Sequence, residues 1–290
     1  PLGALTRGLQ GQVLTEMNEL TQAGCVGFGQ ADQAVTDTQV LQRALQYAAT
    51  FGYTVWLRPQ DAHLGQGVAA SGALATRMGL SGVPVAAETI ALHTLFALMR
   101  STGARVHLCR ISSAAGVELV RQAKAEGLPL TCDVSINSLH LTDLDMGYFD
   151  SRARLSPPLR QQADRKALRA ALADGTIDAL VSDHHPVQGD EKALPFAEAE
   201  PGASGVELLF KEGEDFIVYQ DENPEHTEHA LLAELDRLLA DPARMDQIGK
   251  SGYARISAEH TYLHRAQSLL IALDSAPRKS NPQPADFFLA

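Results

Sequence analysis

The chain has 290 residues, of which 45% are hydrophobic, and a formal net charge of −11. This length suits two ordinary domains or one barrel, and the hydrophobic fraction is enough to bury a sizeable core. The negative charge argues against nucleic acid or an anionic membrane surface as a partner. No apolar run reaches the roughly 18 residues that span a bilayer, and no signal peptide opens the chain, so we expect no membrane segment.

The three cysteines, Cys25, Cys109 and Cys132, lie in expected strands or at their ends. They lack the C-x-x-C spacing that is typical of redox motifs and structural zinc sites. We therefore expect them to be reduced core residues of a cytoplasmic protein.

The first hundred residues predict alternating helices and strands, because apolar residues recur at helical spacing and then in short runs. The expected elements are a helix over 16–23, a strand over 25–28, a helix over 38–51, a strand over 53–57 and a helix over 87–101. Residues 65–82 are rich in Gly, Ala and Ser, which predicts a loop with a short helix. The glycines of this loop do not have the spacing of a phosphate-binding loop.

Residues 104–143 predict a strand–helix–strand unit. Apolar runs over 106–111 and 128–134 flank a segment whose apolar residues recur at helical spacing. Two parallel strands joined by one helix must lie in a sheet that is covered by helices. A helix over 164–174 and a strand over 177–181 extend the same pattern.

The text of this unit carries a resemblance to a known family. Residues 104–143 read ARVHLCRISSAAGVELVRQAKAEGLPLTCDVSINSLHLTD. This text resembles the middle of dihydroorotases, which are barrels of the amidohydrolase superfamily, and the resemblance covers about residues 1–209. It implies an α/β fold, an incomplete TIM-type (β/α) barrel. The first strands are missing from it, since the H-x-H-x-R motif of the first barrel strand has no counterpart here.

The resemblance also implies that the zinc ligands of active members are replaced. Arg110 and Asn137 stand where those members have histidines, and Gln30 stands where many have an aspartate. A guanidinium cannot bind zinc and a neutral amide oxygen binds it poorly. Arg110 would also place a positive charge where the metal's charge should be. His107 is no substitute, because side chains alternate along a strand and positions 107 and 110 should point to opposite faces.

Further positions of the family pattern differ as well. Arg58 and Gln60 stand for a histidine and a glutamate, and Ser156 replaces an asparagine that contacts substrate in active relatives. Glu88 matches a family glutamate, although a capping residue in the first turn of its helix is an equally good interpretation. The sequence therefore resembles the family in its scaffold residues and differs from it at the zinc-binding and substrate-binding positions.

The turn 182–187 holds the strongest candidates for remaining chemistry. Asp183, His184 and His185 follow an expected strand, and a barrel places its site at such strand ends. In the alternative interpretation, Asp183 caps the turn and the histidines pack locally. A hydrolytic zinc needs about three converging ligands. We therefore predict no catalytic residue, no metal ligand and no cofactor, with Asp183 as a vestige that pairs with Arg110.

Residues 210–290 differ in kind. They resemble the C-terminal end of group 1 (GT-B-type) glycosyltransferases through DPARMDQIGKSGYAR and HTYLHRA, so only the closing helices of that fold are represented. The expected elements are a strand over 216–219 and helices around 231–239, over 242–251 and over 253–273. His260, His264 and Arg265 would share a helix face, but H-x-x-x-H without an intervening glutamate favours a packing or solvated role.

Three function classes follow. The preferred one is a non-catalytic dihydroorotase-like subunit of pyrimidine biosynthesis that supports the catalytic subunit of aspartate transcarbamoylase, as the resemblance implies, within an oligomer. The second is an active zinc-dependent dihydroorotase, which the replaced ligands oppose. The third is a glycosyltransferase fragment, which only the tail supports.

Overall fold

The computed structural model describes residues 1–203, 237, 240–244, 247 and 250–251. The chain divides into two units, residues 1–205 and residues 206–290. The first unit contains the sheet, its covering helices and the residues that the family pattern singles out.

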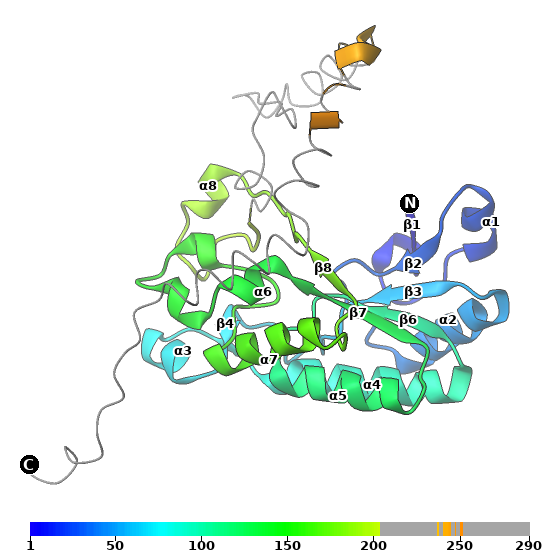
Figure 1. Cartoon of the computed structure of the whole chain (residues 1–290), viewed down its shortest axis with the longest axis horizontal. Helices are drawn as coiled ribbons and strands as arrows, with labels where there is room; N and C mark the ends of the chain where they lie inside the picture. Colours follow the sequence, from blue (N-terminus) through cyan, green and yellow to red (C-terminus); the bar gives the residue numbers. More distant parts are fainter. Residues whose placement is uncertain (204–236, 238–239, 245–246, 248–249, 252–290) are drawn as a thin grey trace, which may run out of the picture. The chain divides into compact units, whose positions relative to one another are not determined.

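A six-stranded parallel sheet forms the framework of the first unit (Figure 1). Its strands are β1 (Leu2–Ala4), β2 (Gly27–Gly29), β3 (Thr54–Leu57), β6 (Arg105–Leu108), β7 (Leu130–Ser135) and β8 (Ala179–Val181). They lie in the order β1-β2-β3-β6-β7-β8, and every neighbouring pair is parallel. The five strands expected from the sequence are confirmed in direction and order, with ends shifted by a few residues. Within the described residues β1 and β8 are the two ends of an open sheet, which is a partial barrel.

Eight helices accompany the sheet within residues 1–203. They are α1 (Met17–Gln22), α2 (Thr38–Phe51), α3 (Ala73–Met78), α4 (Val85–Thr102), α5 (Ala114–Ala125), α6 (Ile136–His140), α7 (Gln162–Ala173) and α8 (Gly189–Lys192). Four of them, α2, α4, α5 and α7, cover one face of the sheet (Figure 1). Short 3-10 turns lie at Arg7–Leu9, Asp143–Met146 and Ser151–Ala153. Helix α4 packs between α2 and α5, and α5 packs against α7. None of the helices that the structure describes is long and apolar enough to cross a membrane.

Helix α2 shows how local sequence sets these elements. The side chain of Asp37 accepts hydrogen bonds from two backbone N–H groups of the first turn, which satisfies donors that a helix start leaves open. The buried residues of the helix recur at helical spacing and form its inner face: Leu41, Ala44, Leu45 and Ala48. Gly52 ends the helix in the left-handed conformation, with a φ of 70°. The expected bounds of this helix are confirmed.

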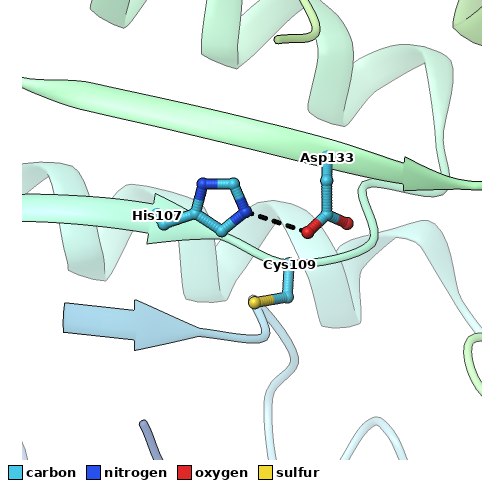
Figure 2. A group of neighbouring side chains, drawn as sticks. All are labelled: His107, Cys109 and Asp133. Atoms are coloured by element: carbon cyan, nitrogen blue, oxygen red, sulfur yellow. Dashed lines mark hydrogen bonds and ion pairs between the residues drawn. The ribbon is translucent and has the colours of Figure 1, made fainter. Parts of the chain in front are cut away.

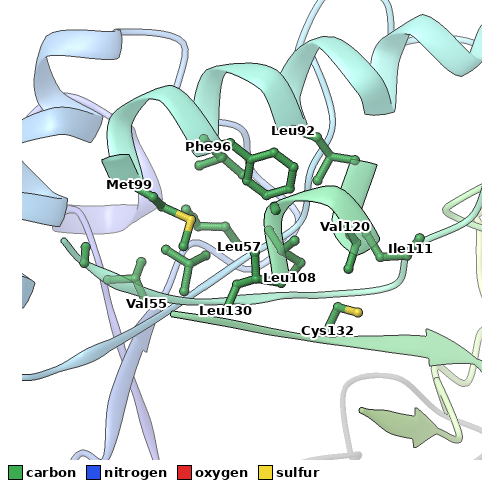
Figure 3. Close-up of a cluster of buried hydrophobic side chains, with 14 of the residues drawn as sticks. Val55, Leu57, Leu92, Phe96, Met99, Leu108, Ile111, Val120, Leu130 and Cys132 are labelled. Atoms are coloured by element: carbon green, nitrogen blue, oxygen red, sulfur yellow. The ribbon is translucent and has the colours of Figure 1, made fainter. Parts of the chain in front are cut away.

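Alternate residues of the strands face the helices and form the core (Figure 3). The strand side of this core contains Val55, Leu57, Val106, Leu108, Leu130 and Cys132. Leu92, Phe96 and Met99 of α4 pack against them. Because strand side chains alternate, the intervening residues point to the other face. These are Trp56, His107 and Asp133, so the second face is polar and aromatic.

The segment over 65–82 contains the short helix expected there, which is α3. Two strands that the sequence did not predict flank this helix, β4 (Ala69–Ala70) and β5 (Gly82–Val83), and they pair in parallel. Two residues are too few to show a periodic pattern, so a sequence pattern could not identify these strands.

Most of the tail lies outside the described residues, and with it the strand expected at 216–219 and the helices expected around 231–239 and over 253–273. Residues 242–244, 247 and 250–251 are described and helical, within the helix expected over 242–251. The side chain of Asp241 accepts a hydrogen bond from the backbone N–H of Arg244 at 2.9 Å, as a helix N-cap does.

Candidate functional site

Four charged side chains converge beyond the carboxyl ends of the strands. Asp32, Arg58, Arg110 and Asp183 follow β2, β3, β6 and β8, whose carboxyl ends meet at one edge because the strands are parallel. We call these residues the strand-end cluster. Nη1 of Arg110 lies 3.1 Å from Oδ1 of Asp183, and its Nη2 pairs with Asp32. Nη1 of Arg58 lies 3.7 Å from Asp32. The cluster is therefore an ion-pair network with two cations and two anions.

Arg110 is fixed in this network from several sides. Its backbone adopts the left-handed conformation, with a φ of 57°, which few residues other than glycine favour. Its backbone N–H donates to Oδ1 of Asp133 at 2.7 Å, and Nη1 donates to the carbonyl of Ser156 at 3.1 Å. The side chains of Arg110 and Asp183 are only 18% and 17% exposed. The pairing of these two residues that we supposed from the sequence is present.

The other two replaced positions, Gln30 and Asn137, offer no suitable zinc ligand either. Gln30 is buried, and it accepts from the hydroxyl of Thr6 at 2.9 Å and donates to the carbonyl of Leu9 at 2.8 Å. The oxygen and the nitrogen of its amide are thus both engaged in hydrogen bonds with the N-terminal segment. Asn137 lies in α6, and its buried Nδ2 has no partner among the described residues. An amide N–H₂ is a donor and not a ligand. The residues present do not fit a zinc ion at the family's position.

A small cavity lies beside the strand-end cluster. This cavity, bounded by Arg58, Arg110, Arg160, Glu88 and Ser112, has a volume of about 10 Å³, which is the space for one water molecule. Burial lowers the pKa of Arg58 to about 10, so its guanidinium still carries a charge at neutral pH. This cavity is thus lined by three arginines and one glutamate, and it is too small for a pyrimidine ring.

Glu88 does not act as the cap of its own helix, which was one of the two interpretations from the sequence. It lies in the first turn of α4 and is 4% exposed. Its carboxyl group accepts from the backbone N–H and the hydroxyl of both Ser112 and Ser113, at distances of 2.5 to 3.1 Å. Ser113 is the N-cap of α5. Glu88 therefore joins the start of α4 to the start of α5.

The turn after β8 places only one of its three candidates in the strand-end cluster. Asp183 adopts a φ of 49° and binds Arg110. His184 and His185 are exposed, and the backbone N–H of His185 donates to the carbonyl of Ala203 at 2.9 Å. The three side chains therefore form no common site within the described residues.

One group of polar residues was missed by the sequence argument: His107, Cys109 and Asp133 (Figure 2). We excluded His107 because a strand over 106–111 would point it away from Arg110. Strand β6 ends at Leu108 and Arg110 has a left-handed backbone, so that alternation does not extend to position 110. In the observed register of β6 and β7, Leu108 lies beside Cys132, which brings Asp133 near Cys109, and no local pattern in the sequence gives this register.

The thiols of this region are expected to be unreactive. Burial and the charge of Asp133 raise the pKa of Cys109 to about 12, and burial raises that of Cys132 to about 12. Only the thiolate reacts with iodoacetamide, so at pH 8 both residues should label about a thousandfold more slowly than free cysteine. Mass spectrometry of peptides from the folded and the urea-unfolded chain measures this. Equal labelling rates in the two states would contradict the expectation.

Comparison with known proteins finds relatives for most of this chain. A "Dihydroorotase-like protein" of Pseudomonas aeruginosa is 46% identical over 210 residues, which are 72% of this chain and 50% of that protein. Over 72% of its length this chain is therefore similar to dihydroorotase-like proteins, which supports the resemblance to the amidohydrolase superfamily. A dihydroorotase of Geobacter sp. (strain M21) is 42% identical over 208 residues, 71% of this chain and 49% of the relative. The dihydroorotase-like chain thus spans about half the length of these relatives.

Solved structures show the same fold. L-hydantoinase (dihydropyrimidinase) from Arthrobacter aurescens superposes with a TM-score of 0.59 at 25% identity, covering 71% of this chain and 48% of the hydantoinase. D-hydantoinase from Thermus sp. gives a TM-score of 0.56 at 21% identity, covering 71% and 47%. The dihydroorotase-like part therefore has part of the barrel of the hydantoinase fold. Residues 193–271 match a family described as glycosyl transferase-like.

Proposed function

We propose that this chain is a non-catalytic dihydroorotase-like subunit of pyrimidine biosynthesis in the cytoplasm. It supports the catalytic subunits of aspartate transcarbamoylase within an oligomer. The observation that carries the proposal is the ion pair between Arg110 and Asp183. A zinc hydrolase needs about three neutral or anionic ligands around its metal, and here a guanidinium pairs with the remaining carboxylate. The parallel sheet that carries this pair is retained, which suits a structural role.

The test of the partner uses the full chain and the aspartate transcarbamoylase catalytic subunit of the same organism. We expect the two to elute together in size-exclusion chromatography, with a mass by light scattering above that of either alone. Separate elution at concentrations of tens of micromolar would contradict the proposed partner.

The active-enzyme alternative has its own measurement. The chain supplemented with zinc is expected to show no hydrolysis of dihydroorotate at neutral pH. Hydrolysis that depends on added zinc and disappears in Asp183→Ala would show that the chain is an active dihydroorotase. A catalytically inactive chain that also fails to bind the transcarbamoylase would leave the family assignment intact and remove only the partner.

Restoring one ligand should not restore activity. In Arg110→His and in Asn137→His we expect no dihydroorotate hydrolysis, because one imidazole does not supply the three converging ligands and the oriented partners that a hydrolytic zinc needs. The measurement is the rate of ring opening with added zinc, compared with buffer alone. A rate above background in either single variant would mean that the site is only one substitution from function.

The match of residues 193–271 to glycosyl transferase-like proteins supports a second candidate, a glycosyltransferase fragment. Calorimetric titration of the full chain with a uridine or guanosine diphosphate sugar tests it. Saturable binding would favour this candidate over a purely structural role, and absence of heat would oppose it.

A further inference from the structure

A three-residue group on the polar face of the sheet has the composition of a metal site (Figure 2). His107 lies on β6, Cys109 directly follows that strand, and Asp133 lies on the neighbouring strand β7. One imidazole nitrogen, the cysteine Sγ and one carboxylate oxygen all lie within 4.8 Å of one another. His107 and Asp133 are 7% and 3% exposed. Imidazole, thiolate and carboxylate are the three ligand types that zinc takes from proteins.

We propose that His107, Cys109 and Asp133 bind one divalent transition-metal ion of the zinc type through Nε2, Sγ and a carboxylate oxygen. Three protein ligands are the number found in zinc sites that keep a fourth position open. Nε2 of His107 lies 2.9 Å from Oδ2 of Asp133, and the metal takes the place of this hydrogen bond. Ligand atoms of a tetrahedral zinc are about 3.3–3.8 Å apart, so the side chains need to shift by about 1 Å or less.

The neighbours of the group hold two of its ligands in orientation. Nδ1 of His107 lies 2.7 Å from the hydroxyl of Thr131. Oδ1 of Asp133 accepts the backbone N–H of Arg110 at 2.7 Å, which leaves Oδ2 directed at His107. Such outer contacts fix the ring nitrogen and the carboxylate oxygen that face a metal, and they are a regular feature of protein metal sites. Thr131 and the N–H of Arg110 therefore supply the outer hydrogen bonds that orient His107 and Asp133.

Charge balance favours the same conclusion. A thiolate and a carboxylate carry two negative charges, which a divalent ion neutralises in a largely buried place. Burial and the charge of Asp133 raise the pKa of Cys109 and keep its thiol protonated in the metal-free chain. A bound metal offsets both effects and replaces the thiol proton, so one proton is released for each ion bound. The reaction needs no oxidant or reductant.

This site is distinct from the position of the family's zinc. Its ligands are His107, Cys109 and Asp133, whereas the strand-end cluster contains the guanidinium of Arg110 and the carboxylate of Asp183. The inference revises our expectation that the chain holds no metal, and it does not depend on the proposed partner.

The experiment is a titration of the chelator-treated full chain with Co²⁺. Two signals report on the site: thiolate-to-cobalt charge-transfer absorption, and quenching of Trp56, which is the chain's single tryptophan. The ring centroid of Trp56 lies 4.1 Å from that of His107. We expect both signals to saturate at one Co²⁺ per chain and to be reversed by one equivalent of Zn²⁺.

Variants decide which residues bind. Cys109→Ser should abolish the charge-transfer band, and Asp133→Asn should weaken Co²⁺ binding by at least about tenfold, since it removes the anionic ligand and keeps the shape. Cys25→Ser and Asp183→Ala should bind as the parent chain does. Circular dichroism checks that each variant is folded. If Asp133→Asn does not fold, the loss of the charge-transfer band in Cys109→Ser is the test of the site.

Two results would overturn the inference. One is the absence of a charge-transfer band at saturating Co²⁺. The other is a metal signal that survives Cys109→Ser. If that signal is lost in Asp183→Ala instead, the metal lies at the family's position, and the non-catalytic assignment fails as well.

Discussion

Replacing Arg110 by alanine is expected to lower the free energy of unfolding by about 3–5 kcal/mol, the range for removing one partner of a buried ion pair. Asp183, which is only 17% exposed, would then lose its ion-pair partner and keep only the electrostatic attraction of Arg58 among the described residues. The substitution also removes the cation that pairs with Asp32. This second loss should cost little, because the side chain of Asp32 is 46% exposed and water already reaches it. Equilibrium unfolding in urea measures the change.

Asp183→Ala should cost less, about 1–2 kcal/mol, because Arg110 keeps Asp32 and the carbonyl of Ser156 as partners. The double variant should be more stable than the sum of the two single losses predicts. Arg100→Ala is the matched control, since it breaks an ion pair with Glu126 whose two side chains are about half exposed, and it should change stability far less. Additive effects of the Arg110 and Asp183 changes would show that the two residues are not coupled in solution.

Local signals in the sequence were sufficient for five of the six strands of the main sheet and for most helices. In α2 the cap at Asp37, the apolar stripe and the terminal Gly52 are all within fifteen residues of one another, so a pattern records them completely. The partners of Glu88 are different. Ser112 and Ser113 lie 24 and 25 positions further along the chain, and no local pattern distinguishes a cap of its own helix from a bond to another.

The strand-end cluster was predicted only in part. The pair of Arg110 and Asp183 spans 73 positions, and the resemblance supplied it because the family brings these two positions to one metal. Asp32 has no such role in the pattern, so its contacts with Arg58 and Arg110 were not foreseen. The end of β6 at Leu108 depends on the left-handed backbone of Arg110, which the carboxylate of Asp133 helps to hold. Because this is a tertiary contact, the sequence does not reveal that strand alternation ends before position 110. The expectation that His107 and Arg110 point to opposite faces rested on that alternation.

Glu88→Ala is expected to lower the free energy of unfolding by at least about 3 kcal/mol, because it leaves two buried backbone N–H groups and two buried hydroxyls without their acceptor. Ser112 and Ser113 are 2% and 0% exposed, so water cannot easily replace the carboxyl group. Glu88→Gln keeps the shape but turns one acceptor into a donor that faces donors, so it should also destabilise, by about 2 kcal/mol. A loss below about 1 kcal/mol in Glu88→Ala would mean that Glu88 is dispensable for joining α4 to α5.

Gly116 provides an independent check on the position of Glu88. In most helices a change from glycine to alanine stabilises by up to about 1 kcal/mol. Here an added Cβ would lie 2.9 Å from Cδ of Glu88 and 3.1 Å from Oγ of Ser113, so Gly116→Ala should destabilise the chain. In the Glu88→Ala background the nearer obstacle is gone, and the cost of Gly116→Ala should fall or change sign. An equal cost in both backgrounds, measured by urea unfolding, would show that the carboxyl group of Glu88 does not lie over the first turn of α5.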